Sequence, residues 1–221
     1  MRSVHLLSAM AAILASIASA GANDGVGISS WSGWRPGQIS RTECPELRSV
    51  PLIVSWSKLE STPGRYEFDK HIGDPLRAAA HDGLHVTLMI WVRPGTPEWI
   101  FEMGVPRVYT DRKVNPLGRQ MSRQDNLHPY YLHTEFKRRF FQLIDAFGEY
   151  VNELPPALRD RIVFVQSAEG STGDGQPYKG NPLDDRFAIS DDVWNAYRKE
   201  TWIRYQRALP GVPILVNSDA N

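Results

Sequence analysis

Glu169 is the residue whose type and position point most directly to chemistry. It closely follows the apolar run 162–165, and a turn of small residues, 170–175, comes after it. A carboxyl group held at the end of a buried strand can serve as a general acid when its surroundings raise its pKa. The small side chains of the turn leave space for a substrate. The same pattern also fits a glutamate that only caps this turn, and the residues alone leave both interpretations open.

Other polar and aromatic side chains closely follow the apolar runs. Arg93 comes directly after the run 85–92 and suits hydrogen bonds to hydroxyl groups or to an acidic substituent, although a surface ion pair fits it equally well. Trp56 and Trp99 are candidates for stacking on the apolar faces of sugar rings, with core packing as the alternative that we favour for Trp56. Asp174 suits hydroxyl binding or the tuning of a neighbouring pKa, but an Asp-Gly pair is more typical of a simple turn.

Glu60 and three histidines receive structural interpretations. Glu60 is expected to anchor its own loop, and His128, in the long connection 94–131, is expected to face solvent. His81 and His85 have the spacing of a helical metal pair, but Gly83 interrupts any helix that would join them. The sequence therefore predicts neither a metal site nor a cofactor.

The elements that would position these residues alternate between strand-like and helix-like segments. Apolar runs predict strands at residues 52–56, 85–92, 162–165 and 212–216, with a weaker candidate at 26–30. Helix signals mark residues 74–81, a long amphipathic segment from 134 to 154, and a segment after Ser190 that Pro210-Gly211 breaks. Such a series predicts a parallel α/β architecture, either a doubly wound sheet or a (β/α)8-type barrel.

The glycine motifs of nucleotide-binding folds do not occur, which favours the barrel. No strand-like run is followed by GxGxxG, and GxxxxGK[ST] is absent from the sequence. A full barrel takes about 250 residues. This chain has 221 residues and yields only about five strands. We therefore expect a parallel (β/α)8-type barrel truncated after about the fifth strand, the N-terminal part of a longer enzyme, with an unusual half-barrel or open sheet as the alternative.

Composition narrows the range of partners. The 25 Lys and Arg residues balance 25 Asp and Glu residues, so the formal net charge is zero and no general basic field exists for binding nucleic acid. Hydrophobic residues make up 42% of the chain, enough for a sizeable core. The single cysteine excludes an internal disulfide.

The first residues have the pattern of an export signal. Arg2 precedes an almost entirely apolar or small segment, 6–18, and Ala18-Ser19-Ala20 offers a small-x-small cleavage pattern. A membrane anchor is the alternative, but the apolar run is shorter than the roughly 20 residues that a bilayer requires. We expect residues 1–20 to be a signal peptide cleaved after Ala20, and residues 21–221 to be the barrel domain of a secreted or periplasmic protein with no membrane segment after cleavage.

Several motifs resemble a known family of enzymes. The segments WSKLESTPGRYEFD, GLHVTL and TPEWI are similar to the opening of clan A glycoside hydrolases, with the layout closest to family 42 β-galactosidases. The likeness covers roughly residues 51–174. It implies a (β/α)8 barrel that cleaves a β-glycosidic bond with two carboxylates, acting on an oligo- or polysaccharide. Glu169 then corresponds to the acid/base glutamate after the fourth strand.

The resemblance also defines what this chain lacks. The family usually has Asn directly before the acid/base residue to bind the sugar 2-hydroxyl, whereas this sequence has Ala168, and Gln166 offers a substitute amide on the same face. The family's nucleophile lies on the seventh strand, so the sequence predicts a retaining β-glycosidase whose nucleophile belongs to a missing C-terminal part. The alternatives are a non-catalytic carbohydrate-binding or scaffold barrel and a barrel enzyme of another kind, such as a lyase.

Overall fold

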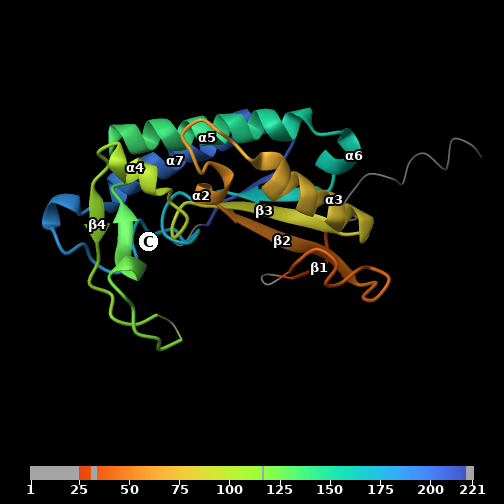
Figure 1. Cartoon of the computed structure of the whole chain (residues 1–221), viewed down its shortest axis with the longest axis horizontal. Coiled ribbons are helices and arrows are strands. Elements are labelled where there is room, and N and C mark those ends of the chain that lie inside the picture. Colours follow the sequence, from red (N-terminus) through yellow and green to blue (C-terminus); the bar gives the residue numbers. More distant parts are fainter. Residues whose placement is uncertain (1–24, 31–33, 116, 218–221) are drawn as a thin grey trace, which may run out of the picture.

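A parallel sheet forms the centre of the protein. The computed structural model describes residues 25–30, 34–115 and 117–217. Within these residues, the five strands of the sheet follow the order β1-β2-β3-β6-β7, and each neighbouring pair is parallel. The strands are β1 (Ile28–Ser29), β2 (Leu47–Ser55), β3 (His85–Trp91), β6 (Ile162–Gln166) and β7 (Ile214–Leu215). An antiparallel hairpin of β4 (Arg107–Tyr109) and β5 (Leu127–Pro129) stands apart from the sheet (Figure 1).

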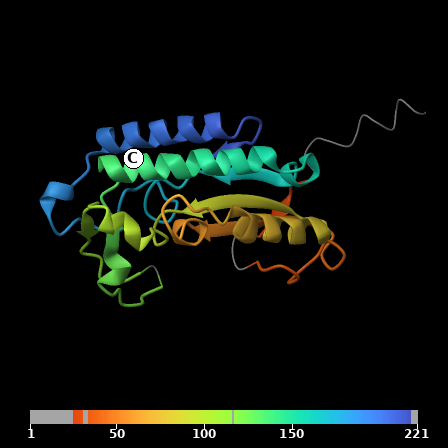
Figure 2. The same ribbon diagram turned by 45° about the horizontal axis from the view of Figure 1, so that its top comes forward.

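Helices connect the strands of the sheet. The main ones are α3 (Asp74–His81), α5 (Thr134–Glu153) and α7 (Asp191–Ala208), and Figure 2 shows α5 and α7 side by side. Shorter helices are α2 (Trp56–Leu59), α4 (Glu98–Glu102) and α6 (Pro156–Arg159). Single turns of other helix types occur at η1 (Asp69–Gly73), η2 (Gln124–Asn126) and η3 (Asp185–Phe187).

The core lies between the sheet and its helices. Residues of α5 that recur at helical spacing are fully buried, and this stripe faces the sheet: Phe136, Phe140, Leu143, Ile144, Phe147 and Val151. Alternate residues of the strands face the same layer, among them Val54, Ile90 and Val165. Burial of this one stripe and this one sheet face fixes which side of each element points inward.

The opposite face of the sheet carries side chains in layers. Pro51, Thr87 and Phe164 are register partners on β2, β3 and β6, and Ile53, Met89 and Gln166 form the next such row. Both rows line one small cavity. Rows contributed by neighbouring strands are typical of the interior of a (β/α)8 barrel. The expected α/β fold is therefore confirmed as a half-barrel of five parallel strands.

The bounds of several strands differ from those predicted. The strand expected at 52–56 begins earlier, at Leu47, and ends at Ser55, because the polar Arg48 and Ser49 belong to it and Trp56 starts α2. The strand expected at 212–216 is limited to Ile214–Leu215, which pairs only with β6 among the described strands. Pro213 lacks a backbone N–H and ends the ladder there. The β4–β5 hairpin has short strands and no apolar run long enough to predict it.

The predicted signal peptide, residues 1–20, lies outside the described residues. Along the part of the chain that the structure describes, no helix combines the length and the apolar character required to cross a bilayer.

Gly148 marks the closest approach of α5 and α7. A Cβ at this position would lie 2.4 Å from the carbonyl oxygen of Ala208, and a backbone atom cannot move aside as a side chain can. We expect Gly148→Ala to lower the free energy of unfolding by about 2 kcal/mol, because overpacking outweighs the gain in helix propensity. Urea denaturation would measure it, with Gln142→Ala on the exposed face of α5 as the control. Equal stability of both variants would contradict this close packing.

Candidate functional site at the carboxyl ends of the strands

The carboxyl ends of the strands meet beneath one loop, residues 167–178. The side-chain amides of Gln166 and Asn217 each donate to the carbonyl oxygen of Gly173 at 3.4 Å. The backbone N–H of Thr172 donates to the carbonyl of Arg93 at 3.0 Å. The loop therefore joins the ends of β3, β6 and β7. In parallel α/β sheets this edge is where ligands bind, and we call it the mouth.

Glycine is required at the centre of this loop. Gly173 has a φ of 79°, in the left-handed region, and follows Thr172, which has a φ of 56°. A Cβ at Gly173 would lie 2.8 Å from the sulfur of Met89 on the layered face of the sheet. The loop thus closes tightly over the end of β3, as the small residues of the turn predict.

Glu169 lies at the mouth, but its carboxylate faces α7. The side chain is 1% exposed and accepts hydrogen bonds from Ser167 Oγ and Trp202 Nε1 on one oxygen. Its other oxygen lies 3.4 Å from Nε of Arg198. Burial raises the pKa of Glu169 above its ordinary value, although Ser167, Arg198 and Trp202 each act in the opposite direction. The pKa of Glu169 is therefore displaced in the direction that a general acid requires.

Arg198 and Trp202 both contact Glu169, and the sequence did not reveal them as its neighbours. Arg198 is fully buried on α7, donates to the carbonyl of Asn217 through Nη2, and lies 4.9 Å from the ring centroid of Trp202. Helical spacing places both side chains on one face of α7. The sequence shows an arginine, Arg198, among the apolar residues of a helix, which is a sign of a buried charged side chain. Nothing in the sequence identifies Glu169 as its partner.

The remaining candidate residues near the loop have defined partners. Asp174 forms an ion pair with Lys179 and accepts a hydrogen bond from Thr172 Oγ1 at 3.3 Å. Gln166 is 8% exposed on the layered face and is held by Gly173. Their roles in substrate binding stay predictions. Both side chains lie in or beneath the loop that contains Glu169.

Trp56 and Trp99 belong to the interior. Trp56 is completely buried, and its indole N–H donates to Glu60 at 2.7 Å. Trp99 packs edge-on against Trp56 at 5.9 Å and donates to the carbonyl of Glu60 at 3.0 Å. Stacking of Trp56 on a sugar is therefore excluded in this fold, because neither face of its ring reaches solvent, and Trp99 is nearly as buried. Glu60 also accepts from the backbone N–H of Gly64 at 2.7 Å, as expected for an anchor of its loop.

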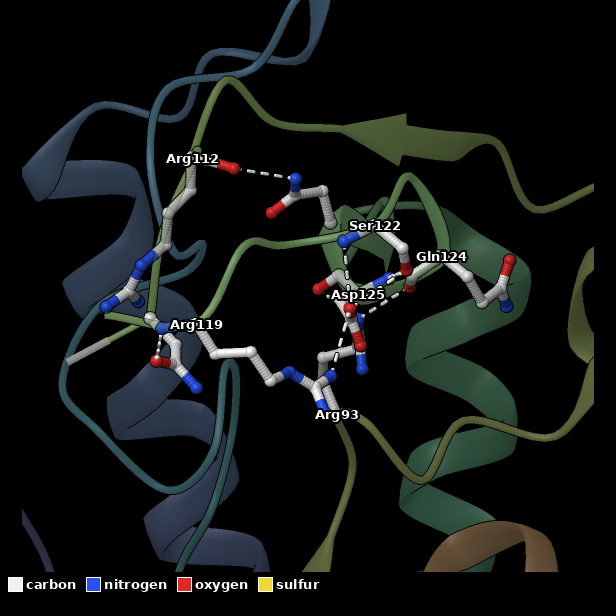
Figure 3. A network of polar contacts seen from close by, with 8 residues as sticks. Arg93, Arg112, Arg119, Ser122, Gln124 and Asp125 are labelled. Carbon is white, nitrogen blue, oxygen red and sulfur yellow. Dashed lines mark hydrogen bonds and ion pairs between the residues drawn. The ribbon is translucent and has the colours of Figure 1, made fainter. Parts of the chain in front are cut away.

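Arg93 holds a loop in place at the mouth. Its Nη2 donates to the carbonyls of Gln124 and Asp125 at 2.9 and 2.6 Å (Figure 3). Its Nε donates to the carbonyl of Leu127. These bonds bind the end of β3 to the start of β5. Backbone carbonyls accept most of the hydrogen bonds that the guanidinium group can donate. The position of Arg93 therefore requires neither a surface ion pair nor a ligand. Hydrogen bonding of Arg93 to a sugar stays a prediction.

His128 is buried, contrary to expectation. It is 1% exposed on β5, with Nδ1 at 3.3 Å from the hydroxyl of Tyr131 and its ring 5.4 Å from that of Tyr178. The prediction of a solvent-facing position was wrong because His128 belongs to a strand of the unpredicted hairpin that packs against the domain. Burial, followed by the charges of Arg93 and Lys179, lowers its pKa to about 3.

This low pKa predicts a loss of stability in acid. The unfolded chain takes up a proton near the ordinary pKa of 6.5, whereas folded His128 stays neutral until about 3. Its contribution is therefore present above pH 6.5 and lost as the pH falls, by about 2 kcal/mol at pH 5. We expect His128→Gln to reduce the difference in unfolding free energy between pH 7 and pH 5 by that amount. The exposed His81→Gln is the control, and an unchanged difference in His128→Gln would contradict the assignment.

The fold resembles that of solved (β/α)8 barrels. A parallel half-barrel with layered side chains on one face is the architecture of (β/α)8 enzymes, and solved structures with this architecture match the chain. Endo-glycoceramidase II from Rhodococcus sp., in complex with a five-membered iminocyclitol, has a TM-score of 0.50 and 16% identity over 86% of this chain and 47% of its own. The same enzyme with a cellobiose-like isofagomine has a TM-score of 0.50 and 15% identity over 81% and 44% of the two chains.

Another match is the catalytic domain of β-amylase from Paenibacillus polymyxa, with a TM-score of 0.46 and 14% identity over 67% of this chain and 37% of that one. The chain thus spans less than half the length of these structures. No family model matches it, and no curated protein matches it. At these identities the likeness concerns the fold alone: this chain has the fold of part of a glycoside hydrolase barrel, and the narrower likeness to family 42 stays a prediction.

Proposed function

We propose that the protein is a retaining β-glycosidase, β-galactosidase-like, in which this chain supplies the acid/base half of the barrel. The observation that carries the proposal is Glu169, a carboxyl group at the mouth whose pKa burial raises. Such a carboxyl group is protonated at a pH where ordinary glutamates are ionised, as a general acid must be.

The proposed mechanism divides the work between two carboxylates. Glu169 protonates the oxygen of the departing sugar and later removes a proton from the attacking water. The nucleophile would lie about 5–5.5 Å away on a part of the barrel outside this chain. In this proposal the amide of Gln166, which donates to the carbonyl of Gly173 in the structure, would hydrogen-bond a sugar hydroxyl in place of the asparagine that Ala168 replaces.

One observation favours a second candidate, a non-catalytic carbohydrate-binding barrel. The carboxylate of Glu169 is almost fully buried and is bonded to Ser167 in its own loop and to Trp202 and Arg198 on α7, so these bonds attach the loop to α7. A buried, fully hydrogen-bonded carboxylate is also what a structural role requires. Catalysis therefore requires the carboxyl to exchange these partners for the substrate.

An activity assay on the native exported protein separates the two candidates. We expect the native protein to have an intact mass well above 25.0 kDa and to start after Ala20, which would support the proposed signal peptide and the missing nucleophile. It should hydrolyse aryl β-glycosides with retention of anomeric configuration, whereas residues 21–221 alone should not. Saccharide binding without hydrolysis by the native protein would establish the second candidate. Turnover by residues 21–221 alone would contradict a nucleophile located elsewhere.

A further inference from the structure

Two loops join to form a wall beside the mouth. The hydroxyl of Thr110 donates to the carbonyl of Lys179 at 2.7 Å, and the backbone N–H of Asn181 donates to the carboxylate of Asp111 at 2.8 Å. The backbone N–H of Leu183 donates to the carbonyl of Tyr109 at 2.8 Å. We call residues 107–115, 117–126 and 178–183 the mouth wall. Arg93 binds this wall to the end of β3 (Figure 3).

Positive charge outweighs negative charge on the mouth wall. Its basic residues are Arg107, Arg112, Lys113, Arg119, Arg123 and Lys179, against the acidic Asp111 and Asp125. Since the chain as a whole has a formal net charge of zero, this excess is a local property of the wall. An excess of one sign on a surface raises the local concentration of ions of opposite charge.

The acidic groups near the wall already have partners. Asp111 accepts from both nitrogens of Asn181, and Asp125 accepts from Ser122 and lies 3.3 Å from Arg119. Arg107 forms an ion pair with Glu98, and Lys179 forms one with Asp174.

Three cations of the wall are in no ion pair with a described residue, although the charge of Lys113, after the hydrogen bonds from Asn181, helps to lower the pKa of Asp111. Among the described residues, no carboxylate lies within ion-pair distance of Arg112, Lys113 or Arg123. The guanidinium of Arg112 donates to the carbonyl of Val114 at 2.9 Å, and that of Arg123 lies over the ring of Tyr109 at 4.3 Å. Lys113 and Arg123 are exposed.

The cations of the wall act on one another and on the buried His128. Burial and then the charge of Arg112 lower the pKa of Lys179, and the charges of Arg93 and Lys179 act on His128 in the same direction. Cations from three segments therefore act on one region beside the mouth. A bound anion would reduce the repulsion that remains among these cations.

We propose that the glycan bound at the mouth is anionic, bearing carboxylate or sulfate groups that Arg112, Lys113 and Arg123 contact. The proposal rests on the proposed glycan-directed function and names its substrate class. A guanidinium group forms paired hydrogen bonds with planar carboxylates and with sulfate oxygens. The stacking of Arg123 on Tyr109 holds one such group in a fixed orientation.

Matched polymers and matched variants test the charge requirement. Binding of the full chain would be measured by calorimetry with polygalacturonate against its methyl ester and with dextran sulfate against dextran. We expect the charged member of one pair to bind and its neutral partner to bind far more weakly, with affinity falling as NaCl is raised. Lys113→Gln/Arg123→Gln should weaken that binding about three- to tenfold. Arg159→Gln/Arg207→Gln, which removes equal charge at the other end of the strands, should leave it unchanged.

Every other outcome would overturn the proposal, and each would do so for a different reason. Equal binding of charged and neutral polymers would remove the charge requirement but keep a glycan-directed function. Equal weakening by both double variants, or equally tight binding of a DNA oligonucleotide, would indicate nonspecific attraction. Absence of binding to all four polymers would overturn the inference. Hydrolysis of aryl β-glycosides by the native protein would then show that the proposed function survives without it.

Discussion

Replacing Glu169 with glutamine in the native protein is expected to lower kcat/KM for an aryl β-glycoside with a poor leaving group by about 10²–10⁴-fold, the range that general acid catalysis contributes. Glutamine keeps the size of the side chain and can still accept from Trp202, but it has no acidic proton. A leaving group that departs readily as an anion needs no proton, so the loss should be much smaller for a dinitrophenyl glycoside. The limb of the pH profile at higher pH, where the acid ionises, should also disappear.

Two controls make this result specific. Glu200→Gln changes an exposed carboxylate on α7, the helix that Glu169 faces. Glu200 pairs with Lys137 at the surface, and its replacement should leave kcat/KM unchanged. Unfolding free energy should be measured alongside, because Glu169 is buried. Equal losses with good and poor leaving groups, or wild-type activity in Glu169→Gln, would assign Glu169 to packing and favour the carbohydrate-binding candidate.

Replacing Arg198 with methionine is expected to lower the free energy of unfolding at neutral pH by about 3–5 kcal/mol. Both side chains of the Arg198–Glu169 pair are 1% exposed, so removal of the arginine leaves a carboxylate buried without its counter-charge. The double variant Glu169→Gln/Arg198→Met should lose less than Arg198→Met alone, because it leaves no unpaired charge. Urea denaturation of the single and double variants measures this coupling.

The pH dependence separates charge from packing in this variant. Burial already raises the pKa of Glu169, and loss of Arg198 removes one of the groups that oppose this rise. A raised carboxyl pKa favours the folded state below the unfolded value of 4.5, and that stability is lost as the pH rises through the folded pKa. The deficit of Arg198→Met should therefore be small near pH 4 and large near pH 8. An equal deficit at both would indicate that Arg198 acts through its contact with Trp202.

The sequence determined the elements that depend on short-range pattern. The helices at Asp74–His81 and Thr134–Glu153 appear where their apolar periodicity and capping residues predict them. The buried central strands do as well, because a strand covered on both faces must be apolar along its length. Order along the chain was then enough to predict a parallel barrel-type sheet.

Features that depend on pairing at a distance came only from the tertiary structure. The partner of Glu169 is on α7, remote in sequence, so no local spacing reveals that Arg198 and Trp202 face it. His128 is buried because β5 pairs with β4 and packs against Tyr131 and Tyr178, a contact that its short strand does not reveal in the sequence.

The features of the candidate site also fall into two groups, those that follow from local sequence pattern and those that depend on the tertiary structure. The sequence by itself placed Glu169, the glycine-rich turn and Arg93 at the ends of strands, because parallel strands joined by crossovers bring those ends to one edge. Only the tertiary structure decided that Trp56 lies in the core, that Arg93 binds backbone carbonyls and that cations from separate loops share one wall. Side-chain direction and burial result from packing over the whole domain, whereas the position along the strand results from the local pattern alone.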